Sequence, residues 1–141
     1  MKLVLPAELK ARLEGEAKAA LPNECCGLLI GSRSENIIRV LDLAPSENIA
    51  ANPAQTFEVD MRLRLRLQKE LRDTGTSIIG HYHSHPNGRI GLSGTDKDQA
   101  WEDEMVWLII AVTTDDYILS ADLYDAEAKV FQALLPEIEA G

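Results

Sequence analysis

The chain has little cysteine: its only two cysteines, Cys25 and Cys26, are adjacent. A disulfide between neighbouring residues is strained and closes no useful loop, so we expect no disulfide framework. A structural zinc site made of thiolates would also need more cysteines. Any bound metal ion must therefore be held by histidines and carboxylates. Both cysteines are predicted to be small core residues rather than nucleophiles, because nothing basic flanks them.

Basic residues are also scarce, with 14 Lys and Arg against 23 Asp and Glu and a formal net charge of −9. An acidic surface repels phosphate backbones, so nucleic acid is a disfavoured partner. Five of the 14 basic residues lie within residues 62–72. This stretch could recognise an acidic partner, but a solvated helix face is the favoured interpretation.

Long apolar runs are missing as well. The segment 1–6 is too short for a secretory sequence, and no stretch approaches the roughly 20 apolar residues that span a bilayer. We therefore predict a cytoplasmic protein without a membrane partner. A length of 141 residues is typical of one domain, and we expect a single domain over residues 1–141.

Periodicity and propensity predict a mixed α/β (α+β) fold, in which helices flank a central, largely antiparallel sheet. Helices are expected over residues 6–20, 61–72 and 95–104, and Trp101 and Trp107 are expected in the core. Strands are expected over residues 26–31, 37–43, 77–84, 106–113, 117–124 and 129–135, the first two forming a hairpin.

The residues that indicate chemistry follow the predicted strand 77–84. Alternate residues of a strand share a face, so His83 and His85 project from the same side. Pro86 then ends the strand, and a glycine-containing loop leads to Asp96 at the start of a helix. Two imidazoles and one carboxylate could hold a zinc ion and leave a fourth position for water, as in catalytic rather than structural zinc sites.

Amide hydrolysis at such a site needs a base, for which Glu24 is the candidate, and Ser93 could donate a hydrogen bond to the developing oxyanion. Each residue also has a structural interpretation. Histidines in a strand are often satisfied by ordinary hydrogen bonds, and Glu24 could be a surface carboxylate. Ser93 and Asp96 form a Ser-x-x-Asp capping box, which competes for the Asp96 carboxylate. A fourth ligand, His81, is conceivable, but we predict that it is buried or supports the ligands.

Glu24, His83-Ser84-His85-Pro86, Ser93 and Asp96 together resemble the JAMM (MPN+) motif of the JAB-domain metallopeptidases. Asn23-Glu24-Cys25-Cys26-Gly27-Leu28-Leu29 and Thr56-Phe57-Glu58-Val59-Asp60 are similar to stand-alone prokaryotic members. The resemblance implies a fold similar to that of cytidine deaminases. It further implies zinc held by His83, His85 and Asp96, with Glu24 as general base and Ser93 at the oxyanion.

The same resemblance implies hydrolysis of peptide or isopeptide bonds at the C-terminus of ubiquitin-like proteins, including sulfur carriers. Such a tail, often ending Gly-Gly, would lie extended beside the site. One alternative is a non-catalytic scaffold or protein-interaction module of the same fold, although every ligand of the motif is present. A zinc nucleoside deaminase is a weaker alternative, because its H-x-E and P-C-x-x-C patterns are absent.

Overall fold

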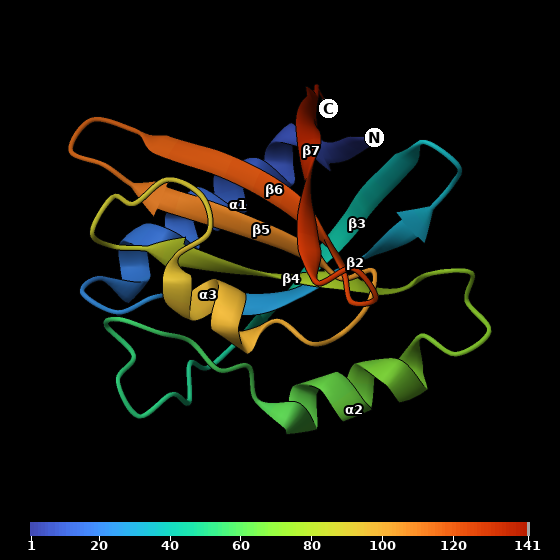
Figure 1. The fold of residues 1–141 in the computed structure, drawn as a ribbon, viewed down its shortest axis with the longest axis horizontal. Helices are drawn as coiled ribbons and strands as arrows, with labels where there is room; N and C mark the ends of the chain where they lie inside the picture. Colours follow the sequence, from blue (N-terminus) through green and yellow to red (C-terminus); the bar gives the residue numbers. More distant parts are fainter. Residues whose placement is uncertain (141) are drawn as a thin grey trace.

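The computed structural model describes residues 1–140, in which seven strands pair in the order β1-β3-β2-β4-β5-β6-β7 and close into a barrel (Figure 1). Three helices accompany them. In chain order the elements are β1 (Lys2–Pro6), α1 (Ala7–Ala20), β2 (Cys26–Arg33), β3 (Ile37–Ser46), α2 (Met61–Glu70), β4 (Ser77–His85), α3 (Gly94–Gln99), β5 (Val106–Val112), β6 (Tyr117–Asp125) and β7 (Val130–Glu139).

The mixed α and β composition is confirmed, but the sheet is closed and contains three parallel pairs. β1 pairs in parallel with both β3 and β7, and β4 pairs in parallel with β5. The other four pairs are antiparallel, among them the predicted hairpin of β2 and β3. Because β1 joins β3 to β7, this short strand, which was not predicted, closes the sheet.

The alternation of side chains along the strands separates two packed regions. The larger cluster joins one face of α1 (Leu9, Leu13 and Ala17) to inward residues of the strands, among them Leu29 and Tyr82. The smaller cluster joins Leu67 of α2 to Leu28, Ile30 and Ala44. Figure 1 shows α1 behind the strands, α3 in front of them and α2 below them. On β4, Tyr82 therefore points toward α1, and its neighbours His81 and His83 point toward the other side.

Several boundaries differ from the prediction. α3 ends at Gln99 rather than at residue 104, and Glu104 has a left-handed φ of 59°, which a helix does not accommodate. β3 continues to Ser46, three residues beyond its predicted end. Trp107 is buried as predicted, but the core position predicted for Trp101 is wrong, since 73% of this residue is exposed.

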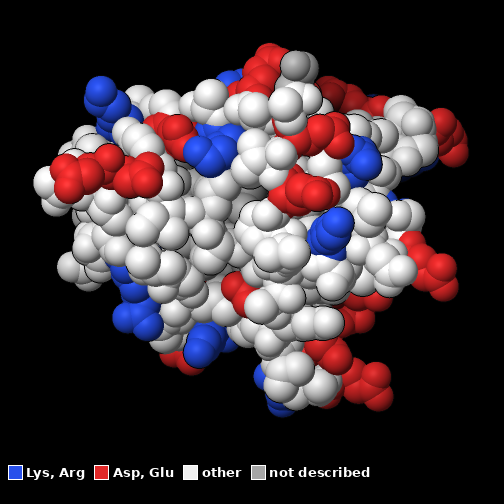
Figure 2. Space-filling view, turned by 90° about the horizontal axis from the view of Figure 1, so that it is seen from above, with Lys and Arg blue, Asp and Glu red and all other residues white. Residues whose placement is uncertain are grey.

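The surface carries mixed charge. Figure 2 shows acidic side chains spread over the face seen from above, with lysines and arginines scattered among them and no continuous basic patch on that face. Residues 61–70 form the predicted basic helix, and its arginines pair with acidic neighbours: Arg62 with Asp60, Arg64 with Glu102 and Arg66 with Glu70. None of the described helices has the length and apolar character needed to cross a bilayer.

Candidate metal centre

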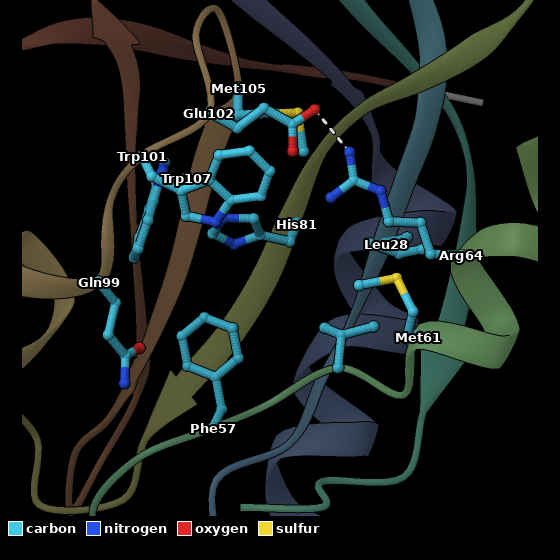
Figure 3. A pocket seen from close by; sticks show the side chains of 11 residues that line it. Leu28, Phe57, Met61, Arg64, His81, Gln99, Trp101, Glu102, Met105 and Trp107 are labelled. Carbon is cyan, nitrogen blue, oxygen red and sulfur yellow. Dashed lines mark hydrogen bonds and ion pairs between the residues drawn. The ribbon is translucent and has the colours of Figure 1, made fainter. Parts of the chain in front are cut away.

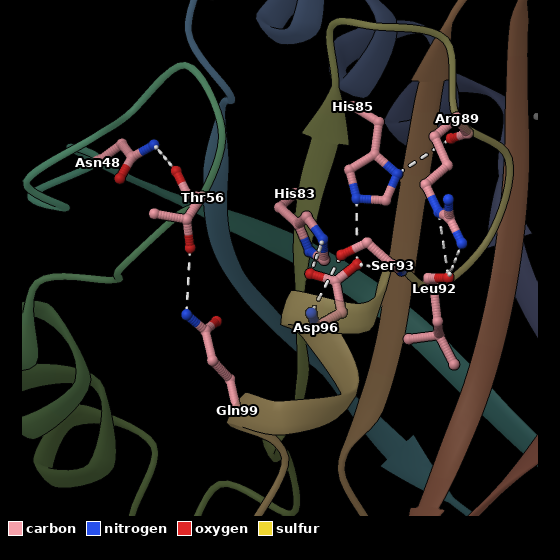
Figure 4. Close-up of polar contacts among 9 residues, drawn as sticks. All are labelled: Asn48, Thr56, His83, His85, Arg89, Leu92, Ser93, Asp96 and Gln99. Carbon is pink, nitrogen blue, oxygen red and sulfur yellow. Dashed lines mark hydrogen bonds and ion pairs between the residues drawn. The ribbon is translucent and has the colours of Figure 1, made fainter.

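The end of β4 brings two imidazoles together. β4 stops at His85, where Pro86 prevents continuation of the ladder. His83 and His85 lie on the same face, as their spacing predicts, and their ring centroids are 5.0 Å apart. Both residues are buried. Figure 4 shows the two rings above the first turn of α3, from which Asp96 points toward them.

The loop after β4 orients the His85 ring. Its Nδ1 lies 3.0 Å from the carbonyl oxygen of Arg89 (Figure 4). A carbonyl only accepts, so Nδ1 carries the hydrogen, and in a neutral imidazole the lone pair is then on Nε2. The loop can turn back tightly because Gly88 has a φ of +80°, which glycine adopts without steric cost. Ligating histidines are commonly held this way, by a hydrogen bond from the other ring nitrogen.

Asp96 lies between the two imidazoles. Its Oδ1 is 3.0 Å from Nε2 of His83, and its Oδ2 is 3.0 Å from Nε2 of His85. The capping box expected for Ser93 also forms: the Ser93 hydroxyl accepts from the amide of Asp96, and the Ser93 amide donates to Oδ2 at 2.9 Å. The two interpretations of Asp96 do not compete here, because Oδ2 completes the capping box and Oδ1 still faces His83.

The protonation preferences of these groups follow from burial and proximity. Burial opposes ionisation of Asp96, but the two imidazoles hold the pKa of its carboxyl well below the usual range. Burial lowers the pKa of His83, although Asp96 opposes the shift. Burial would also lower the pKa of His85, but its contacts with Asp96 and with the Arg89 carbonyl raise it above its ordinary value. Asp96 is thus an anion that attracts positive charge to the imidazoles.

The donor set fits a divalent cation. A lone pair on Nε2 of His85 and a carboxylate oxygen 3.0 Å away repel each other unless a proton or a cation lies near both. Nε2 of His83 is buried and makes no hydrogen bond despite its proximity to Oδ1 of Asp96. Zinc–ligand bonds of 2.0–2.2 Å place tetrahedral ligand atoms about 3.3 Å from one another, close to the spacing seen here. Two imidazoles and a carboxylate are also donors that zinc accepts.

Glu24 completes the cluster from the segment that leads into β2, the neighbour of β4 in the sheet. It precedes β2, and ligand atoms of Glu24, His83 and His85 all lie within 4.8 Å of one another. Its side chain is buried, and Oε1 has no hydrogen-bond partner. Burial raises the pKa of Glu24 to about 7, with His85 opposing the shift and Asp96 adding to it. Such a carboxyl can accept and release a proton near neutral pH. The geometry also makes Glu24 an alternative carboxylate ligand.

Backbone and side-chain hydrogen bonds fix Glu24 in this place. The amide of Cys25 donates to Oγ of the buried Ser84 at 2.8 Å, and the amide of Ser84 donates to the carbonyl of Cys25 at 3.1 Å. The side-chain amide of Asn48 donates to the carbonyl of Glu24 at 3.0 Å. This reciprocal link between the start of β2 and the end of β4 sets the distance from Glu24 to the histidines.

Glu24, His85 and Ser93 line one open cavity of about 580 Å³, which we call the polar cavity. Its remaining lining residues are Pro22, Ala54, Gln55, Pro86, Asn87, Arg89 and Thr95. The structure thus brings together all five predicted site residues. A substrate in the polar cavity would meet the carboxyl of Glu24 and the hydroxyl of Ser93 at the same time.

The sequence patterns did not predict two contacts of the histidines, one with Phe57 and one with Arg89. The Phe57 ring stacks on His83, with 4.0 Å between centroids and an interplanar angle of 16°. Arg89 contributes its carbonyl, which no side-chain pattern reports. His81 lies outside the group of close ligand atoms and packs edge-on against Trp107 at 4.3 Å. Burial lowers the pKa of His81 to about 3, so its ring is neutral.

Comparison with known proteins finds one matching family model and several similar proteins. Residues 6–124 match the model of the family described as prokaryotic homologs of the JAB domain. Desampylase of Haloferax volcanii is 31% identical over 88 residues, which are 62% of this chain and 62% of that protein, so the match covers less than two thirds of the relative.

Two solution structures resemble the fold. One, of a Desulfitobacterium hafniense protein, has a TM-score of 0.86 and 26% identity and covers 99% of this chain and 94% of that one. The other, of a Salinibacter ruber protein, has a TM-score of 0.66 and 22% identity, with 97% and 92% covered, and shows the likeness of fold alone. Because the family model spans most of the chain, this protein belongs to the family of prokaryotic homologs of the JAB domain.

Proposed function

We propose that the protein is a zinc-dependent metallopeptidase or isopeptidase, and that it cleaves a peptide or isopeptide bond at the C-terminal tail of a ubiquitin-like or sulfur-carrier protein. The observation that carries the proposal is the convergence of the Asp96 carboxylate and the imidazoles of His83 and His85 beside the unpartnered Oε1 of Glu24. Membership of the JAB-domain family and the similarity to a desampylase support the same reaction class.

In this proposal, His83, His85 and Asp96 hold the zinc ion. Bound zinc would supply Lewis-acid polarisation of the scissile carbonyl and acidification of the attacking water. The Arg89 carbonyl keeps the hydrogen of His85 on Nδ1, which leaves the Nε2 lone pair free to bind a metal ion, and the Ser93 amide holds Oδ2 of Asp96 so that Oδ1 is available. Both contacts orient ligands before the ion binds.

Glu24 transfers the proton, and Ser93 stabilises the developing oxyanion. Glu24 takes a proton from the attacking water and later gives it to the leaving amine, which would otherwise depart as an unstable anion. Ser93 already accepts from the Asp96 amide through Oγ, so its hydroxyl hydrogen is available for the carbonyl oxygen as negative charge develops there. Both groups line the polar cavity, which is where the tail would lie.

The test is a cleavage assay on defined substrates. Zinc-loaded protein is incubated with ubiquitin-like sulfur-carrier proteins that bear C-terminal extensions, and the products are measured by mass spectrometry. We expect release of the extension, its loss when a chelator is added, and its recovery when zinc is restored. Glu24→Gln serves as the matched inactive control. Intact tails after prolonged incubation with zinc-loaded wild-type protein would contradict the proposal and favour a non-catalytic interaction module.

A further inference from the structure

A second cavity lies next to the polar one, beyond a single side-chain hydrogen bond. Nε2 of Gln99 donates to Oγ1 of Thr56 at 3.1 Å and so links α3 to the loop before α2 (Figure 4). Gln55 and Thr95 line the polar cavity. Phe57 and Gln99 line the second cavity, which has a volume of about 170 Å³. The Thr56–Gln99 link therefore stands at the border between the two.

The second cavity, which we call the aromatic cavity, has walls of flat rings (Figure 3). The Trp107 ring meets Phe57 edge-on at 6.2 Å and His81 edge-on at 4.3 Å between centroids. Trp101 stands at the side of the cavity with 73% of its surface exposed. The chain has two tryptophans, and both line this cavity. Such walls favour an apolar occupant.

The aromatic cavity is in direct contact with the metal centre. Phe57, one of its walls, is stacked on His83 at 4.0 Å, and the Trp107 ring centroid is 6.0 Å from that of His83. An extended chain advances 3.3–3.6 Å per residue, so two or three residues span about 7–11 Å, enough to pass from a bond held at the centre across the Phe57 ring to a side chain in the cavity.

The size and the rim of the aromatic cavity indicate a side chain of another protein. Small-molecule sites usually measure about 300–1,000 Å³, so a cavity of 170 Å³ holds one side chain rather than a whole ligand. Two of its lining residues, Trp101 and Met61, are largely exposed. Exposed apolar side chains gathered around a cavity are typical of a surface that binds a protein.

The lining of the aromatic cavity also includes polar side chains. Nδ1 of His81 is buried without a hydrogen-bond partner, and an ion pair of Arg64 with Glu102 lies at the edge (Figure 3). We propose that the aromatic cavity binds one apolar side chain of the substrate, of the size of Leu, Met or Phe, about two or three residues from the cleaved bond. This inference rests on the proposed function, and it assigns to the substrate an apolar residue near the bond.

Binding can be tested without turnover by using the two tryptophans as reporters. Zinc-free Glu24→Gln protein is titrated with the peptides acetyl-Gly-Gly-Leu-Gly-Gly-amide and acetyl-Gly-Gly-Asp-Gly-Gly-amide while the indole N–H signals are followed by NMR. We expect saturable shifts of both signals with the Leu peptide and binding of the Asp peptide that is weaker by about tenfold or more. Trp101→Ala should weaken the Leu-dependent shift of Trp107.

A matched control and a cleavage assay complete the test. Leu135→Ala removes another exposed apolar side chain, from β7, and should leave the Leu-dependent shifts unchanged. Zinc-loaded wild-type protein is then given tails in which one Leu is moved along a glycine background. One position should raise kcat/KM about tenfold, chiefly through KM, and Trp101→Ala should lose this preference.

The outcomes separate this inference from the proposed function. Indole shifts in a protein that hydrolyses nothing would support binding of an apolar side chain in the aromatic cavity, but would overturn the hydrolase and with it the placement of that side chain near a cleaved bond. Hydrolysis with equal kcat/KM at every Leu position, together with unshifted indoles, would overturn the cavity assignment and leave the hydrolase intact.

Discussion

The polar cavity and the aromatic cavity are neighbours built from the same strand, yet they carry opposite chemistry. β4 supplies His85 to the first and His81 to the second, with His83 between them. At the polar end the imidazoles lie beside a carboxylate: oxygens of Asp96 are 3.0 Å from Nε2 of His83 and from Nε2 of His85. At the aromatic end His81 packs edge-on against Trp107 and lies outside the group of close ligand atoms. The difference teaches that the surroundings of a histidine, and not its place in an H-x-H-x-H pattern, decide whether it can bind a metal.

The largest effect should come from removing a ligand at the polar end. His83→Ala is expected to weaken zinc binding more than about 100-fold, beyond the 10–100-fold typical of losing a group that only supports a ligand. Hydrolysis should fall to background. His81→Ala is the matched control from the aromatic end and should keep zinc within about tenfold. Metal analysis after dialysis measures the zinc content of both variants. Equal zinc loss in the two would contradict the claim that His83 binds the metal and His81 does not.

Glu24→Gln should reduce turnover by about 10²–10⁴-fold, the usual cost of losing an acid–base group. The amide keeps the size of the side chain but cannot take up a proton, so zinc content should stay near that of the wild-type protein. Steady-state kinetics on the tailed sulfur carrier and metal analysis of the same sample give both values. Undiminished turnover would remove Glu24 from the reaction.

Ser93→Ala should lower kcat by about 10²–10³-fold if its hydroxyl donates to the oxyanion. The same change removes the cap of α3 and should cost about 0.5–2 kcal/mol in the free energy of unfolding. Ser93→Thr keeps a hydroxyl that can do both, and it should recover most of each loss. If kcat of Ser93→Ala falls only in proportion to the fraction of protein that is no longer folded, Ser93 caps the helix and takes no part in the reaction.

The smallest effect is expected at the border of the two cavities. Gln99→Ala removes one exposed hydrogen bond to Thr56, so the free energy of unfolding should fall by no more than about 1 kcal/mol, with zinc content unchanged. Urea unfolding compares this variant with Gln68→Ala, an exposed substitution on α2. A loss of several kcal/mol would mean that the Gln99–Thr56 contact contributes much more to the stability of the fold than one exposed hydrogen bond.

The sequence predicted most individual elements because they depend on local patterns. Leu9, Leu13 and Ala17 repeat at helical spacing and are all buried in α1. Barrel closure depends instead on β1, whose five residues are too few to display a period and whose partners, β3 and β7, are distant in the chain. Its pairing with both could be seen only in three dimensions.

The arrangement of the site could be predicted as far as it is local. His83, His85 and Asp96 lie within fourteen residues, and strand alternation followed by a helix start is enough to expect their convergence. Glu24 lies just before β2, far along the chain from the histidines, and without the resemblance to a family it could equally have been a surface carboxylate. The stacking of Phe57 on His83 and the exposure of Trp101 depend on loop conformation, which apolar character alone does not predict.

The most direct test concerns which carboxylate holds the metal, since Asp96 touches both imidazoles and Glu24 lies within 4.8 Å of them. The measurement is the zinc dissociation constant, by chelator competition, of the two isosteric variants Asp96→Asn and Glu24→Gln. We predict that Asp96→Asn weakens zinc binding by about 100-fold or more and that Glu24→Gln stays within about tenfold of wild type. The reverse order would make Glu24 the ligand and contradict the account.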